Sequence, residues 1–309
     1  MELGGRENQG REKCISSKNL RSKTMSDVLA VIMQLSVLVF VITSMLAMGL
    51  SLTVKQIIDP LRSVRLVLLA LVANFILVPI LAYLILLVVP LEEGLATGLI
   101  LMATAAGAPF LPKLAQVAKG NMAFSVGLMV MLMVVTIIYM PIVVPLLLQG
   151  VEINPWDIAK SLIVMMLIPL AIGLFIKARY ESIAESLHPH MSQTSTVALV
   201  LLMVSALVLN FSEIIGVIGT GAIIAILVFL IVALVLGYFM GGPAADSKSV
   251  LGLGTAQRNL SAALVVAGQN FADDPNVLVM ILVAGLIGLV VLMLVGGEMG
   301  RRSQAAAEE

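Results

Sequence analysis

Apolar segments of about 20 residues recur along this chain, and their length limits the folds that it can adopt. Of its 309 residues, 60% are hydrophobic and only 12% are charged. A soluble domain carries about a quarter charged residues, whereas a helix of about 20 apolar residues crosses the hydrocarbon core of a bilayer. Strands of a membrane barrel would be shorter and would alternate polar with apolar residues, which these segments do not. The sequence therefore predicts an all-α, polytopic membrane protein.

We predict about nine transmembrane helices, with boundaries accurate to a few residues, at 28–50, 64–89, 95–117, 121–148, 157–177, 192–211, 214–240, 249–271 and 276–297. They make up a single membrane domain over residues 26–300. A polar N-terminal tail, residues 1–25, is expected to be disordered. A short C-terminal tail, residues 301–309, follows the domain.

Basic residues concentrate on one side of these helices. The odd-numbered connections and the C-terminal tail carry ten of them: Lys55, Arg62, Arg65, Lys113, Lys119, Lys177, Arg179, Lys248, Arg301 and Arg302. The even-numbered connections carry acidic residues instead: Glu92, Glu93, Glu152, Asp273 and Asp274. Because an excess of Lys and Arg marks the cytoplasmic side, we expect a multi-pass protein of the cell membrane with a cytoplasmic C-terminus.

The N-terminal tail disagrees with this orientation. An odd number of spans places it outside, although it holds Arg6, Arg11, Lys13, Lys18, Arg21 and Lys23. Either the tail is translocated, or the count of spans is off by one, or these residues are not part of the natural protein. We favour the third alternative, because Met25 directly precedes the first apolar segment.

The charge balance and the single cysteine exclude several partners and cofactors. The net charge is zero, so bulk electrostatics favours no nucleic acid. Cys14 alone forms neither an internal disulfide nor a thiolate metal cluster. His188 and His190 lie in a predicted connection beside Pro189, which favours a solvated loop over a metal site. We expect no cofactor; the partners are the lipid bilayer and a small solute.

Two of the predicted helices contain residues that interrupt a helix. The third has Gly107, Pro109 and Pro112, and prolines lack a backbone donor and clash with the preceding turn, so it should unwind from Ala108 to Pro112. The eighth combines glycines with consecutive polar residues: Gly252, Gly254, Thr255, Gln257, Arg258 and Asn259. Unwound backbone persists in a membrane only where protein packs on it or where it lines a wet cavity.

The positions of these two helices indicate an inverted repeat. They lie five spans apart, so they cross the membrane in opposite directions, and their neighbours pair likewise around the unpaired fifth helix. Interrupted helices at corresponding positions of two antiparallel halves are typical of secondary transporters with a site at the membrane midplane. The alternative is that both are kinked helices of another kind of bundle.

Arg258 is a permanent charge inside a predicted span, with no acidic residue in any span to pair with it. A buried charge of this kind is costly unless a cavity, a partner or a bound ion faces it. Either carbonyls of the broken third helix satisfy the guanidinium, as a structural strut, or a mobile anion does. Arg presents planar paired donors that suit a carboxylate, sulfate or phosphonate, so we predict transport of a small organic anion.

Other polar residues and the helix break complete the predicted substrate site. With Arg258 it comprises Gln257, Asn259, Thr255, Ala108 and Asn74. For Asn74 alone, a hydrogen bond to a neighbouring helix is the competing interpretation. An intramembrane enzyme would need a nucleophile with a base, or a metal cluster; because no His, Asp or Glu lies inside a predicted span, we expect no enzyme.

Three segments resemble the bile acid:sodium symporter family. They are residues 49–85, which are similar to its second and third helices, residues 114–148 with "GNMAFSVG", and "RNLSAALVVA" at 258–267, which is similar to the family's "QNxxLAxxxA" helix. The likeness extends over roughly residues 26–298. It implies ten helices in two inverted five-helix repeats, or nine when the first is missing. It also implies a core domain around the crossing broken helices that moves against a panel domain.

The chain departs from this family where the resemblance places sodium ligands. The Ser-Asn pair at the first break falls at Leu111 and Pro112, and the Glu and Gln of the later helix fall at Gly254 and Arg258. The Thr of the following helix falls at Met129, whereas Ser125 remains as a remnant of a sodium site. Asn259 is retained, and an upstream Gln becomes Asn74.

We therefore expect Arg258 to take over the place of the cation, with transport no longer driven by sodium. The protein would then be a facilitator, an exchanger or a proton-coupled carrier, so the coupling ion, sodium or proton, stays open. A relative that keeps the fold without transporting is the remaining alternative.

Overall fold

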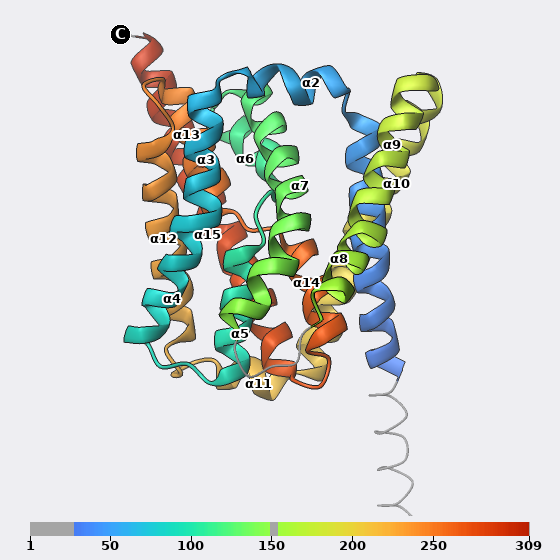
Figure 1. The fold of residues 1–309 in the computed structure, drawn as a ribbon, viewed down its shortest axis with the longest axis vertical. Helices are drawn as coiled ribbons and strands as arrows, with labels where there is room; N and C mark the ends of the chain where they lie inside the picture. The colour runs from blue at the N-terminus through green and yellow to red at the C-terminus, as the bar shows by residue number, and fades with distance from the viewer. Residues whose placement is uncertain (1–27, 149–153, 309) are drawn as a thin grey trace, which may run out of the picture.

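The computed structural model describes residues 28–148 and 154–308, and this part of the chain is helical and contains no strand (Figure 1). The prediction of an all-α membrane protein is confirmed. Within these described residues, seven helices are long and apolar enough to cross a membrane: Val28–Ser51, Val64–Val88, Met122–Leu147, Pro155–Arg179, Glu181–Leu209, Ala222–Met240 and Pro275–Ala305. The predictions about the basic tail and a start at Met25 lie outside the described residues.

The two helices predicted to be interrupted are both broken into shorter halves. The first consists of α5 (Glu93–Thr104) and α6 (Leu111–Val117). The second consists of α13 (Ala245–Ala256) and α14 (Leu260–Asn270). The two broken helices run in opposite directions in Figure 1. The first runs from α5 at the lower end to α6 at the upper end, and the second runs from α13 at the upper end to α14 at the lower end.

The first break lies earlier than predicted. Residues 105–110 are unwound, and Pro112 lies in the first turn of α6. The first turn of a helix has no acceptor for its N–H groups, so the missing N–H of Pro112 costs nothing there. The predicted unwinding as far as Pro112 was wrong for this reason.

The second break is narrower than the glycines suggested. Gly252 and Gly254 are helical, and only residues 257–259 leave the helix. A Cβ on Gly252 would come within 3.1 Å of the Leu234 carbonyl oxygen of α12 (Ala222–Met240). A Cβ on the α12 residue Gly237 would lie 2.5 Å from both the carbonyl oxygen of Leu251 and the hydroxyl of Thr255. These glycines therefore permit close packing of α12 against α13 rather than unwinding.

Prolines act differently in the other helices. Pro79 follows the π-helical turn η2 (Ala73–Leu77), which joins α3 (Val64–Val72) to α4 (Val78–Val88). Pro169 likewise follows the π-helical turn η3 (Ile163–Leu167), which joins α8 (Pro155–Leu162) to α9 (Ile168–Arg179). Pro79 cannot donate to the Phe75 carbonyl one turn earlier, and the Tyr139 hydroxyl donates to that oxygen instead, at 2.7 Å. Tyr139 belongs to α7 (Met122–Leu147), which continues through two further prolines.

Some predicted helix boundaries were wrong. Helix α10 (Glu181–Leu209) begins well before residue 192, so His188 and His190 are helical and not in a loop. The prediction that no histidine lies inside a span was therefore also wrong. The seventh span is shorter than predicted, because a separate helix α11 (Phe211–Gly216) precedes α12. Helix α15 (Pro275–Glu308) continues through most of the residues predicted as a C-terminal tail.

The first described helix, Val28–Ser51, stands with α9 and α10 on one side of the molecule (Figure 1). Its contact with α9 is backbone to backbone. A Cβ on Gly49 would lie 2.4 Å from the Leu170 carbonyl oxygen, and one on Gly173 would lie 2.6 Å from the Leu46 carbonyl oxygen. Small residues permit such close approach of helices in a membrane. We call these three helices the side group, and the remaining long and broken helices the main group.

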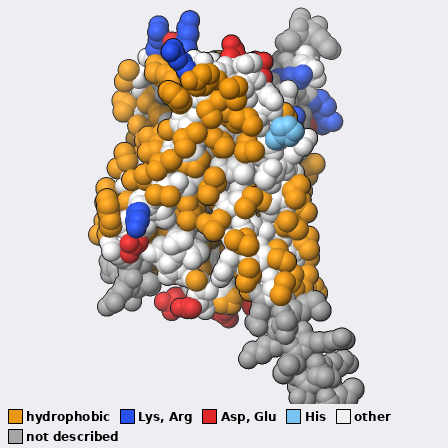
Figure 2. Space-filling model, turned by 90° about the vertical axis from the view of Figure 1, so that its right-hand side faces the viewer, with side chains coloured by type: hydrophobic (Ala, Val, Ile, Leu, Met, Phe, Trp, Pro, Cys, Tyr) orange, Lys and Arg blue, Asp and Glu red, His pale blue; other side chains and the backbone are white. Residues whose placement is uncertain are grey.

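The two ends of the molecule differ in charge. The connection with α2 (Val54–Ile58) and η1 (Asp59–Arg62), the α9–α10 junction and the C-terminus lie at the upper end in Figure 1. Figure 2 shows Lys and Arg side chains gathered mainly at that end, acidic side chains at both ends, and a largely apolar surface between them. The odd-numbered basic connections thus share one end of the fold.

Candidate functional site

The two breaks meet in the middle of the main group. The backbone N–H of Asn259 donates to the carbonyl of Ala105 at 2.8 Å, and its side-chain amide donates to the carbonyl of Gly107 at 3.0 Å. The Asn259 oxygen accepts from the N–H of Ala262 at 3.1 Å and so caps the N-terminus of α14. One fully buried residue thereby ties the two unwound stretches together.

Helix α7 supplies the partners of Ala106 in the first unwound stretch. The Thr136 hydroxyl accepts from the N–H of Ala106 and donates to the carbonyl of the same residue, both at 3.0 Å. Backbone groups that leave a helix in a membrane need such replacements, because no water is present to satisfy them. Thr136 is buried, and the sequence analysis did not identify it.

We expect Thr136→Val to weaken the first break. The substitution keeps the shape of the side chain and leaves both backbone groups of Ala106 unpaired, which costs about 2–4 kcal/mol of stability. The measurement is the melting temperature of the purified protein in detergent. Thr136→Ser, which keeps the hydroxyl, is the matched control; equal melting temperatures for the two variants would show that these hydrogen bonds do not hold the break.

The guanidinium of Arg258 lies beside this crossing and is 3% exposed. Its Nε donates to the Met102 carbonyl at 3.0 Å, and one terminal nitrogen donates to the Ala103 carbonyl at 2.7 Å. The other terminal nitrogen donates to Asn74 Oδ1 at 2.9 Å and to the Thr255 carbonyl at 3.0 Å. Four of the five N–H groups of an arginine are thus used.

Three of these four oxygens belong to the C-terminal turns of two half-helices. Met102 and Ala103 lie in the last turn of α5, and Thr255 lies in the last turn of α13. The last carbonyls of a helix lack intrahelical donors and carry partial negative charge, so each helix end attracts a cation. The carbonyl cluster, one of the two alternatives for Arg258, is therefore present. Among the described residues, no carboxylate forms a salt bridge with it.

The fourth oxygen is held in place by its own amide. Asn74 donates from Nδ2 to the Ala70 carbonyl at 3.0 Å and to the Thr255 hydroxyl at 3.3 Å, which leaves its Oδ1 for Arg258. Both Asn74 and Thr255 are fully buried. The hydrogen bond between neighbouring helices that we considered for Asn74 is thus formed, and it also orients the acceptor for the guanidinium.

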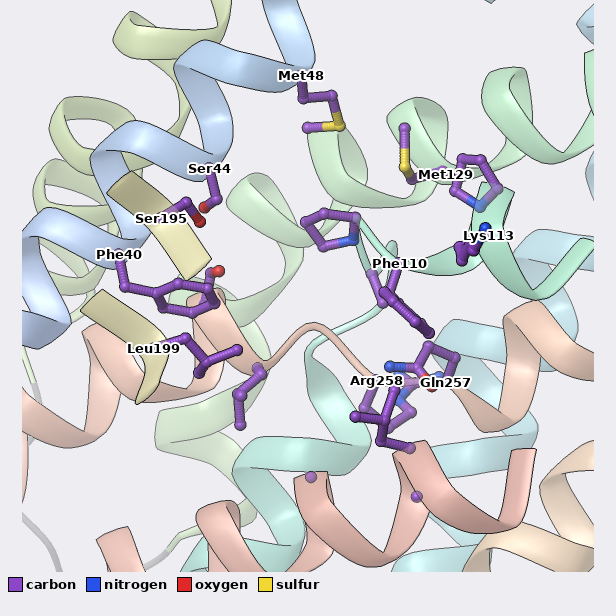
Figure 3. Close-up of a pocket in the computed structure, with 18 of the residues that line it drawn as sticks. Phe40, Ser44, Met48, Phe110, Lys113, Met129, Ser195, Leu199, Gln257 and Arg258 are labelled. Atoms are coloured by element: carbon purple, nitrogen blue, oxygen red, sulfur yellow. The ribbon is translucent and has the colours of Figure 1, made fainter. Parts of the chain in front are cut away.

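A cavity of about 1010 Å³ lies between the side group and the main group. Phe40, Ser44 and Met48 of the first helix and Ser195 and Leu199 of α10 face Phe110, Gln257 and Arg258 across it (Figure 3). Most of the lining is apolar. Its charged residues are Lys113 and Arg258, and none of the described residues that line it is an Asp or Glu.

The predicted substrate residues divide into two sets. Ala108, Gln257 and Arg258 line the cavity, whereas Asn74, Thr255 and Asn259 lie behind its wall. Ser125 is buried, and its hydroxyl donates to the Met122 carbonyl at 2.7 Å within α7.

The sequence analysis missed Lys113 and His188 as cavity residues, and also the serines of the side group. Lys113 lies in the first turn of α6, directly after Pro112 and close to the first break, and that position was the available signal; we had assigned it to a cytoplasmic connection.

Residues without a side-chain oxygen occupy five positions where the resemblance places sodium ligands: Leu111, Pro112, Met129, Gly254 and Arg258. A Cβ on Gly254 would lie 2.9 Å from Leu111 Cδ2 and 3.3 Å from Leu128 Cδ2. Both leucines are fully buried. Hydrocarbon therefore packs on the position where a family Glu would offer a carboxylate.

Comparison with known proteins supports the family that the sequence resembles. Residues 37–240 match the family model described as the Sodium Bile acid symporter family. The chain belongs to this family. The family's proteins are transporters, in agreement with the expectation that the chain is no enzyme.

Individual relatives are more distant. The chain is 28% identical over 169 residues, 54% of its length, to the "Probable sodium/metabolite cotransporter BASS3, chloroplastic" of Arabidopsis thaliana. It is 27% identical over 199 residues, 63% of its length, to the rice protein "Probable sodium/metabolite cotransporter BASS2, chloroplastic" (Oryza sativa subsp. japonica). The matches cover 39% and 47% of those two proteins, so the chain spans less than half the length of the curated relatives that it matches.

Proposed function

We propose that this chain is a secondary membrane transporter of a small organic anion, in which Arg258 replaces the coupling cation. The observation that carries this proposal is the position of the guanidinium between the C-terminal ends of α5 and α13. Secondary transporters use half-helix ends and unwound carbonyls of this kind to coordinate a coupling ion. In this chain a tethered charge contacts the same type of oxygen.

The charge of the cavity supports an anionic solute. Lys113 and Arg258 line it, and Arg258 keeps one N–H that donates to no protein acceptor among the described residues. In a region of low dielectric constant this excess positive charge attracts an anion, and an anion entering it needs no separate sodium ion as counter-charge. The apolar part of the wall is suited to the carbon skeleton of the solute.

Coupling, orientation and location are further parts of the proposal. With Leu111 and Gly254 in place of oxygen ligands, we propose sodium-independent transport by a facilitator, an exchanger or a proton-coupled carrier. We propose that the protein lies in the cell membrane and that its basic end faces the cytoplasm. The C-terminus, which lies at that end, would then be cytoplasmic. Ser125, whose hydroxyl donates within α7, would be the remnant of a sodium site that has lost most of its other ligands.

A thermal-shift screen of the purified protein tests this function. The probes are pyruvate, lactate, methanesulfonate and taurocholate, each measured in sodium chloride and in choline chloride. A ligand that binds only the folded protein raises its melting temperature, by an amount set by the ratio of concentration to Kd. We expect stabilisation by at least one anion, of equal size in both salts. Stabilisation by none of the anions, or only in sodium, would contradict the proposal.

A further inference from the structure

Two polar atoms at the cavity wall have no partner. Gln257 Oε1 and Ser261 Oγ are both buried, and neither forms a hydrogen bond within the part of the chain that the structure describes. Ser261 is 1% exposed, and both residues line the cavity. In contrast, the neighbouring polar side chains Arg258 and Asn259 are bonded to backbone oxygens. Buried polar groups are rarely left unpaired, so the two oxygens indicate a missing partner.

The chemistry of the two oxygens restricts what that partner is. A glutamine oxygen only accepts a hydrogen bond, whereas a serine hydroxyl both donates and accepts. A carboxylate has no proton to give, so it satisfies Ser261 and leaves Gln257 Oε1 unpaired. A hydroxyl group satisfies both, because its proton goes to Gln257 Oε1 while its oxygen accepts from Ser261.

The positions of the two residues place this hydroxyl near the acidic group of the solute. Gln257 directly precedes Arg258, and Ser261 lies in the first turn of α14, just after the break. Figure 3 shows Gln257 beside Arg258 at the wall of the cavity. A solute anion near the guanidinium therefore brings the carbon atoms next to its acidic group toward both residues.

We propose that Gln257 and Ser261 form a hydroxyl-recognition subsite and that the transported anion is a 2- or 3-hydroxy acid. This inference rests on the proposed function and adds the substrate class. A site that hydrogen-bonds a substrate hydroxyl rejects the analogue without it, because its own buried polar groups then stay unpaired.

Matched pairs of acids test the subsite. The Kd of the purified protein is measured for lactate and propionate, 3-hydroxybutyrate and butyrate, and mandelate and phenylacetate. We expect the hydroxy acid of at least one pair to bind about tenfold or more tighter than its partner. Equal affinity within every pair would overturn the subsite while leaving anion transport intact. Failure of all six acids, together with the anions of the thermal-shift screen, to bind would instead remove the proposed function itself.

Variants of the two residues decide where the preference comes from. Ser261→Ala and Gln257→Met should each remove most of the preference for the hydroxy acid. Each variant should bind the hydroxy acid more weakly, with little change in its affinity for the acid that lacks the hydroxyl. The control is Ser205→Ala: Ser205 is as deeply buried, lies outside the cavity lining and already donates to the Leu201 carbonyl at 2.6 Å. A preference that survives in both variants would show that other residues read the hydroxyl.

Discussion

Arg258→Ala should lower the melting temperature by roughly 10 °C and weaken anion binding at least about 30-fold. The substitution leaves the carbonyls of Ala103 and Thr255 and the Asn74 oxygen without a donor, and each unpaired buried group costs about 1–3 kcal/mol. The Met102 carbonyl loses its bond to the guanidinium and keeps only the longer one from the Ala105 N–H, at 3.3 Å. It also removes the positive charge between two helix C-termini. Thermal unfolding in detergent and titration with the anions of the screen measure the two effects.

Chemical rescue and a conservative variant separate the effect of the positive charge of Arg258 from the effect of its hydrogen bonds. Millimolar methylguanidinium should restore part of the melting temperature of Arg258→Ala, because it returns planar donors to the same four oxygens, whereas tetramethylammonium, which has no donor, should not. Arg258→Lys should fall between the wild type and Arg258→Ala, since an ammonium keeps the charge but lacks the fork of donors. Equal rescue by both cations would show that the hydrogen bonds are not what the site requires.

Gly107→Ala should prevent stable folding, with a loss of at least about 3 kcal/mol. Gly107 has φ +79°, where other residues are strained, and an added Cβ would point at the backbone nitrogen of Met133 and lie 2.7 Å from the Met129 carbonyl oxygen. Backbone atoms of α7 cannot move aside as a side chain would. The yield of monodisperse protein after detergent extraction measures the effect.

The matched control for this variant is Gly268→Ala. Gly268 is a helical residue of α14, and a Cβ there would meet no atom within 4 Å. Alanine has the higher helix propensity, so this variant should fold at least as well as the wild type. A normal yield of Gly107→Ala would mean that the first unwound stretch tolerates a different path past α7.

The sequence predicted the architecture where the physical signal is local. Length and hydropathy identified the long helices, and the prolines and polar residues marked both breaks. Their exact limits depend on contacts that no local pattern contains. Pro112 fits in the first turn of α6, and Gly252 serves packing against α12, because tertiary neighbours decide which potential helix breaker breaks a helix.

The sequence predicted the unpaired charge of the candidate site but not the arrangement of the groups around it. An arginine without an acidic neighbour is visible in the sequence. Of the two helix ends that surround it, the end of α13 is adjacent in sequence, whereas the end of α5 lies about 155 residues away. Thr136 and Ser261 look like ordinary small residues of apolar helices, and only the fold reveals that one is paired twice and the other not at all among the described residues. His188 was misplaced because Pro189 suggested a loop, although α10 continues through it.

Uptake of a stabilising anion into proteoliposomes, with and without an inward sodium gradient, tests the replacement of the cation by Arg258 most directly. Initial rates should be equal in the two conditions for the wild type, and uptake should be lost in Arg258→Ala. A rate that rises strongly with the sodium gradient would contradict the account, because a bound sodium ion would then be doing what is assigned to the guanidinium.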